Sequence, residues 1–162
     1  MIKNILFGVI LMSSYVFSSV LYKYEELDLN NGLKVVAIPM NNNSGVIDIN
    51  IFYKVGSRNE IMGKSGIAHM LEHMNFKSTK KLKSGEFDNI VKRFGGNTNA
   101  STSFDYTRYY IKSSKSNLDK SLELFAEMMS NLSLIDDEFQ TERAVVSEER
   151  LWRTDNSPMG YL

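Results

Sequence analysis

The sequence predicts an α+β domain in which an antiparallel sheet packs against helices. Segments with the apolar alternation of β-strands are interspersed with segments of helical character, a mixture typical of α+β proteins. Turn residues separate neighbouring strand segments, which favours hairpins and therefore antiparallel pairing. A hydrophobic fraction of 43% in 162 residues is enough for one domain with its own core.

Five segments have the pattern of strands. The first two flank Asn31-Gly32, a turn pair that is a strong hairpin signal. The last two flank a turn marked by Asp105 and predict a second hairpin, the final strand being rich in aromatic and β-branched residues. The predicted strands span residues 24–29, 33–39, 46–55, 97–103 and 106–113.

Four segments are predicted to be helical, with polar residues positioned to cap them. Ser65 precedes the first helix, Ser84 the second, and Ser116 or Asn117 the third. Acidic residues open the fourth helix, where the helix dipole favours negative charge. The basic segment 77–83, between the first two helices, is predicted to be a solvated connection. The predicted helices span residues 66–76, 86–94, 118–132 and 136–153.

Residues 1–21 have the pattern of a secretory signal. Lys3 provides a positive start, residues 5–16 are largely apolar and uncharged, and small residues follow. We therefore expect a signal peptide over 1–21 and an exported protein, periplasmic or secreted. The alternative is an uncleaved anchor, because residues 4–22 are almost long enough to span a membrane. In that case the protein would be membrane-anchored.

The charge balance and the absence of cysteine exclude several classes of function. Lys plus Arg and Asp plus Glu both number 19, so the formal net charge is zero and nothing favours nucleic acid as a partner. With no cysteine, the chain has no disulfide, no thiolate metal ligand and no cysteine nucleophile.

The most informative stretch is His69-Met70-Leu71-Glu72-His73, which has the form H-x-x-E-H and contains both histidines of the chain. On a helix, His69 and His73 lie one turn apart on one side, a spacing at which two imidazoles can bind one zinc ion. Glu72 lies beside them and could accept a proton from a metal-bound water. The alternative is that the three polar side chains only form a solvated helix face.

A catalytic zinc site usually has three protein ligands and one open position. With both histidines used and no cysteine present, the third ligand has to be a carboxylate, and the last helix offers Glu142, Glu148 and Glu149. Glu142 and Glu149 are seven residues apart and share a face, whereas Glu148 is rotated by about 100° from Glu149. A solvated charged face is the alternative for these acids.

The chain resembles the N-terminal part of the pitrilysin and mitochondrial processing peptidase family of zinc metallopeptidases, most closely its bacterial processing-peptidase-like branch. The resemblance covers nearly everything after residue 21. Four blocks agree with the family in order and spacing, which is far more specific than the H-x-x-E-H string alone. They are Tyr53–Glu60, Gly66–Met74, Gly95–Thr102 and Glu142–Glu149, followed by Asp155-Asn156-Ser157-Pro158.

The resemblance implies a role for each matching residue. His69, His73 and Glu149 correspond to the ligands of one zinc ion, and Glu72 to the general base that activates the zinc-bound water. Glu142 corresponds to an acidic residue that supports the site by holding a ligand. The expected activity is zinc-dependent endoproteolysis.

The resemblance also implies partners. Asn99 and Ala100 match the strand edge along which family members bind the backbone of a peptide or unfolded protein substrate. Family members have at least two homologous halves, so a second half or partner subunit is expected. On this basis residues 22–162 form a metallopeptidase N-terminal domain truncated at its C-terminal end, weak or inactive alone. The alternative function is a non-catalytic subunit or interaction module of the same family.

Overall fold

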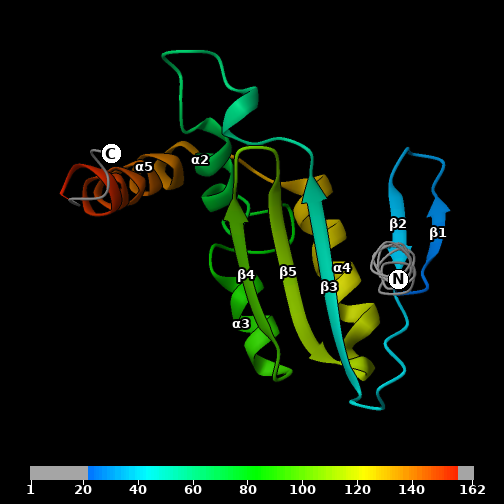
Figure 1. The fold of residues 1–162 in the computed structure, drawn as a ribbon. Helices are drawn as coiled ribbons and strands as arrows, with labels where there is room; N and C mark the ends of the chain where they lie inside the picture. Colours follow the sequence, from blue (N-terminus) through cyan, green and yellow to red (C-terminus); the bar gives the residue numbers. More distant parts are fainter. Residues whose placement is uncertain (1–21, 157–162) are drawn as a thin grey trace, which may run out of the picture. The chain divides into compact units, whose positions relative to one another are not determined.

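A computed structural model describes residues 22–156, which divide into two units at Ser44 (Figure 1). Within the described part of the first unit, β1 (Glu25–Asp28) pairs antiparallel with β2 (Lys34–Ala37). Gly32 adopts φ +85° in the turn, a conformation that glycine reaches without strain, and this confirms the predicted Asn-Gly hairpin. The predicted signal at residues 1–21 lies outside the described residues.

The second unit contains a three-stranded antiparallel sheet with the order β3-β5-β4. Its strands are β3 (Val46–Tyr53), β4 (Asn97–Thr102) and β5 (Thr107–Ser114), and β4 and β5 form the predicted second hairpin. Alternate residues of β5 are buried, as expected for a sheet with one covered face. The predicted α+β class is confirmed, and β4 has no strand partner on its outer edge within residues 22–156.

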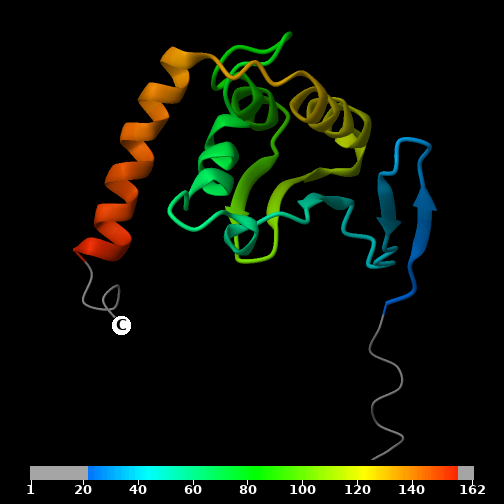
Figure 2. The ribbon, with the colours of Figure 1, turned by 90° about the horizontal axis from the view of Figure 1, so that it is seen from above.

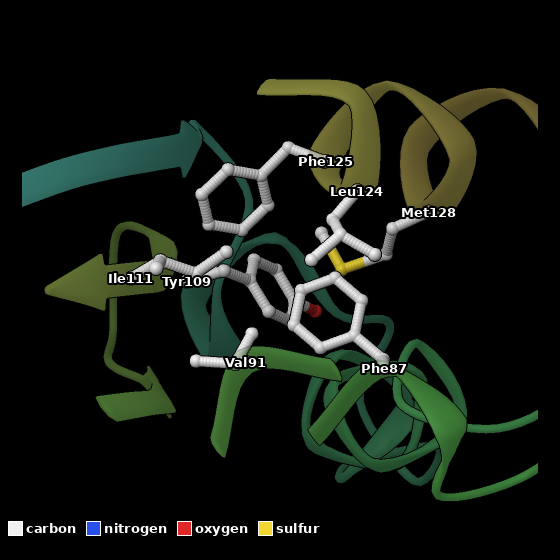
Figure 3. Packing of buried hydrophobic residues seen from close by; sticks show 7 residues of the cluster. All are labelled: Phe87, Val91, Tyr109, Ile111, Leu124, Phe125 and Met128. Atoms are coloured by element: carbon white, nitrogen blue, oxygen red, sulfur yellow. The ribbon is translucent and has the colours of Figure 1, made fainter. Parts of the chain in front are cut away.

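Helices α3 (Glu86–Arg93) and α4 (Leu118–Asn131) build the core against this sheet. Their apolar residues meet Tyr109 and Ile111 of β5 in one cluster (Figure 3). The Tyr109 hydroxyl accepts a hydrogen bond from the Asn75 amide at 2.6 Å. This bond connects the core to the C-terminal end of the helix that contains both histidines. The helical members of the cluster are Phe87, Val91, Leu124, Phe125 and Met128.

The motif helix is α2 (Ile67–Met74), and its capping differs from the prediction. Ser65 is not the cap. The N-cap is Gly66, whose φ of +97° suits only glycine without strain. The carboxylate of Glu60 accepts hydrogen bonds from the N–H groups of Gly66 at 2.7 Å and Ala68 at 2.8 Å. A carboxylate at this end also complements the helix dipole, so Glu60 replaces the predicted serine.

Two other predicted caps are corrected in a similar way. The N-cap of α3 is Gly85 at φ +75°, and Ser84 makes no capping hydrogen bond. Asn117 does occupy the N-cap position of α4, but its amide donates to the carbonyl of Phe94 at 3.3 Å. Local sequence located the start of each helix, but it did not identify Glu60 as the partner of the first N–H groups of α2.

The segment 77–83 is not the solvated connection that its lysines suggested. Thr79 is buried and forms a bridge with Leu132, and its hydroxyl donates to the Glu127 carboxylate at 2.7 Å. The backbone N–H of Ser78 donates to Glu138 at 3.2 Å. The connection is therefore fixed to α4 through Glu127 and to the last helix through Glu138.

The last helix, α5 (Asp136–Arg150), opens with three acidic residues as predicted. It contacts α2 and extends away from the sheet (Figure 2). Regular α-helix ends at Arg150 and continues as a π-helical turn over Leu151–Asp155, instead of running as α-helix to Arg153. Among the described residues, no helix combines the length and apolar character needed to cross a membrane.

Candidate metal centre

Helix α2 presents both histidines on one side, as the i, i+4 spacing predicts. The Nε2 atoms of His69 and His73 are 3.3 Å apart, and the ring centroids are 4.8 Å apart with the planes nearly perpendicular. At this distance the two nitrogens can share one proton or, with both lone pairs free, one metal ion. The pair therefore has the arrangement of two ligands that share one ion.

Helix α5 brings Glu149 to this pair. Its Oε2 atom lies 3.4 Å from Nε2 of His69 and 3.4 Å from Nε2 of His73. The three side chains are between one fifth and one third exposed, so the group is sheltered yet open on one side. The other oxygen of Glu149 forms an ion pair with Arg153.

The triangle fits a zinc ion. Ligand atoms 2.0–2.1 Å from a tetrahedral zinc lie about 3.3 to 3.4 Å from one another, and the three measured edges have these lengths. Within residues 22–156, His69, His73 and Glu149 are the group of residues placed to hold a metal. Two imidazoles and one carboxylate are also a donor set that zinc accepts in catalytic sites.

Glu142 supports this triangle from two turns before Glu149 on α5. It is the buried residue of α5, and its Oε2 atom lies 3.0 Å from Nδ1 of His73. An ionised carboxylate only accepts hydrogen bonds, so Nδ1 is the donor, and in the neutral ring the lone pair is then on Nε2, which faces His69 and Glu149. Burial by itself raises the pKa of Glu142, but hydrogen bonds from Lys77 and His73 outweigh it and hold the pKa below its ordinary value.

Glu72 points toward the sheet instead of toward α5. Its Oε2 atom accepts a hydrogen bond from the Thr102 hydroxyl at the end of β4. The Thr107 hydroxyl next to Thr102 donates to the carbonyl of Val55 at 3.0 Å, which fixes this corner of the sheet. The Glu72 carboxylate thus lies between the motif helix and the edge strand β4.

Asn99 and Ala100 lie in the middle of β4. The Ala100 N–H donates to the side-chain oxygen of Asn99 at 2.8 Å and not to β5, so this N–H faces the free edge of the sheet. Asn99 is exposed, whereas Ala100 is partly buried against the core. Of the two, Ala100 therefore has its backbone groups on the free edge, and its N–H is covered by the side-chain oxygen of Asn99.

Four residues at the site were not predicted. Glu60 caps α2, Thr102 binds Glu72, Lys77 binds Glu142 and Arg153 binds Glu149. One of them had a usable signal, since Arg153 follows Glu149 by four residues, the spacing of neighbours on a helix. Lys77 lies beyond the end of α2 and pairs with Glu142, so its spacing from His73 does not indicate this contact. Glu60 and Thr102 act across loops and strands, and sequence spacing gives no sign of such contacts.

The fold and the site define a metallopeptidase-like domain of the inverted-motif class. Residues 35–157 match the family described as Insulinase (Peptidase family M16), and the chain belongs to this family. This confirms the family inferred from the four sequence blocks.

The relatives include proteins named as zinc proteases and, at 32% identity over 75% of this chain and 25% of that protein, the human cytochrome b-c1 complex subunit 1. The chain is 69% identical over 144 residues to a zinc protease named PqqE from Helicobacter pylori, covering 89% of this chain and 32% of that protein. It superposes with a TM-score of 0.86 on the crystal structure of a Helicobacter pylori protease, with 70% identity over 88% of this chain and 34% of the other.

A second solved structure gives the architecture. The first half of the periplasmic protease PqqL from Escherichia coli superposes with a TM-score of 0.72 at 28% identity, covering 81% of this chain and 29% of the other. The chain therefore has the fold of the N-terminal part of such proteases, and it spans about a third of the length of these relatives.

Proposed function

We propose that this chain is the zinc-binding part of a metalloendopeptidase that hydrolyses peptide bonds within extended substrates. The observation that supports this most directly is the triangle of His69, His73 and Glu149, whose edges of 3.3–3.4 Å equal those of a tetrahedral zinc site. A zinc ion bound there supplies a Lewis acid for the scissile carbonyl and lowers the pKa of a water molecule.

The chain's own residues carry the proton transfers. Glu72 accepts the proton of the attacking water and later donates it to the leaving amine. The Thr102 hydroxyl, bound to Oε2 of Glu72, holds this carboxylate beside the free edge of β4. Glu142 keeps Nδ1 of His73 protonated, so that Nε2 is available as a ligand.

The substrate is a peptide or unfolded protein that adds to the outer edge of β4. Such pairing relies on main-chain hydrogen bonds and demands little of the sequence. To use the Ala100 N–H, the substrate has to displace the Asn99 amide that now accepts from it. Asn99→Ala should therefore change the affinity for a labelled extended peptide, while Asn97→Ala, an exposed change two residues earlier on the same strand, should not.

A second homologous half or partner subunit completes the enzyme, because positioning and the exclusion of water require a closed site. Support comes from PqqL, whose first half is a separate solved structure of which this chain covers 29%. Residues 22–162 are then the N-terminal domain, and this chain alone is weak or inactive. Export is proposed from the signal pattern of residues 1–21, in line with the periplasmic location given for PqqL.

The test measures zinc stoichiometry and cleavage of a long quenched peptide by the chain. We expect one zinc ion per chain, and a loss of affinity in Glu149→Gln that is absent in Glu148→Gln, an exposed neighbour rotated away from the histidines. Failure to bind zinc, or equal affinity in both variants, would overturn the metal site. Cleavage that survives in Glu72→Gln would overturn the assigned base.

A further inference from the structure

The lysine that follows α2 is unusual among the lysines of its segment because its side chain is largely withdrawn from water. Lys77 is 24% exposed, whereas Lys80 and Lys83 are exposed. A buried charge is costly unless a partner compensates it. The partner is Glu142, whose Oε1 atom lies 2.6 Å from the Lys77 Nζ atom and whose side chain is 10% exposed.

The two carboxylate oxygens of Glu142 therefore bind different partners. Oε1 binds Lys77 and Oε2 binds Nδ1 of His73 at 3.0 Å. With one oxygen fixed by a cation, the carboxylate has a single orientation in which the other oxygen faces the imidazole. Lys77, Glu142 and His73 thus form a continuous series of contacts that ends at the metal-binding Nε2 atom.

We propose that Lys77 is a positioning residue for the metal centre. By holding Glu142, it keeps His73 in the tautomer with Nδ1 protonated and Nε2 directed at His69 and Glu149. This inference rests on the proposed zinc site, and it assigns to Lys77 a part in zinc affinity that its membership of a basic loop does not suggest.

A simpler role for Lys77 would be to attach α2 to α5 by an ion pair. If Lys77 only attaches the helices, its loss should change the stability of the fold but not which nitrogen of His73 is protonated. Experiment can therefore distinguish the two roles. The conservative variant Lys77→Arg can be accommodated, because a cavity of about 280 Å³ adjoins the pair, lined by Lys77, Ser84, Asp137, Glu138, Thr141 and Glu142.

The first measurement is zinc affinity, by competition with a chromophoric chelator. Lys77→Met should bind zinc about tenfold more weakly, the lower limit for loss of a partner that orients a ligand. Lys77→Arg should recover most of the affinity, and the matched Lys80→Met should equal the wild type. In a Glu142→Gln background, Lys77→Met should have no further effect, since its route to the metal is already broken.

The second measurement is the ring-nitrogen NMR spectrum of the zinc-free chain labelled with ¹⁵N-histidine, which is simple because the chain contains two histidines. In the wild type, Nδ1 of His73 should have the shift of a protonated nitrogen, and in Lys77→Met both tautomers should appear. Unchanged zinc affinity in Lys77→Met overturns the proposal, as does an affinity loss with an unchanged tautomer. If the wild type binds no zinc, the proposed function fails, while the zinc-free spectra still test Lys77.

Discussion

Helices α4 and α5 are held in the molecule by different kinds of interaction. Helix α4 inserts Leu124, Phe125 and Met128 into the apolar cluster against the sheet. Helix α5 buries only Glu142 among its described residues. Carboxylates on one side of α5 instead make its contacts, to Ser78, to His73 and Lys77, and to the histidine pair.

Helix α4 therefore stabilises the fold, whereas α5 positions side chains of the candidate metal site. Apolar burial on α4 needs no ion and depends little on pH, so it stabilises the domain under all conditions in which the chain folds. Exposed carboxylate contacts are worth little in water, and those of α5 are stronger where a partly buried partner such as Lys77 completes them. The helix that contains Glu149, the proposed distal ligand, is therefore also the one whose contacts to α2 run through the candidate metal site.

The largest expected effect is on the apolar side. Phe125 is 2% exposed, and Phe125→Ala should lower the free energy of unfolding by about 3–5 kcal/mol through lost burial and the cavity left behind. Leu122→Ala on the same helix removes a side chain that is 47% exposed and should cost much less. Chemical denaturation of the zinc-free chain measures both, and equal losses would contradict the distinction between the two faces of α4.

The next effect concerns the order in which the helices open. In the zinc-free chain, backbone amides of α5 should exchange with solvent through a local opening that exposes little surface, whereas those of α4 should require global unfolding. The denaturant dependence of hydrogen exchange distinguishes these cases, since its slope follows the surface exposed. If α5 and α4 share one free energy and one slope, α5 is as firmly attached as the core.

A smaller effect is expected from Glu127, which holds the segment 77–83 on α4. The hydrogen bond from Thr79 is the main cause that lowers the pKa of Glu127 below its ordinary value of 4.5. The ionised carboxylate of Glu127 thus stabilises the fold at pH values above its ordinary pKa. This contribution is lost as the pH falls through the lower pKa of the folded state. Glu127→Gln should reduce the loss of stability between about pH 7 and about pH 3, while Glu123→Gln, an exposed change on the same helix, should not.

Sequence reasoning predicted the placement of side chains correctly where the spacing lies within one helix. The spacing of His69 and His73 placed them correctly, and the seven-residue separation of Glu142 and Glu149 put both on the side of α5 that meets α2. It failed where a partner comes from elsewhere in the fold. Glu60 as the cap of α2 and Thr102 as the partner of Glu72 follow from loop and strand placement, which periodicity does not encode.

The smallest expected effect comes from a polar group within the apolar face of α4. Ser121 is fully buried, and its hydroxyl has no hydrogen-bond partner among the described residues. An unpaired buried hydroxyl costs free energy, and alanine is the better helix former, so Ser121→Ala should leave stability unchanged or raise it by about 1 kcal/mol. Ser130→Ala, at an exposed position of the same helix, gains only from helix propensity. The difference between the two variants in denaturant midpoint isolates the cost of the buried hydroxyl, and a loss of stability in Ser121→Ala would mean that this hydroxyl binds a group inside the core.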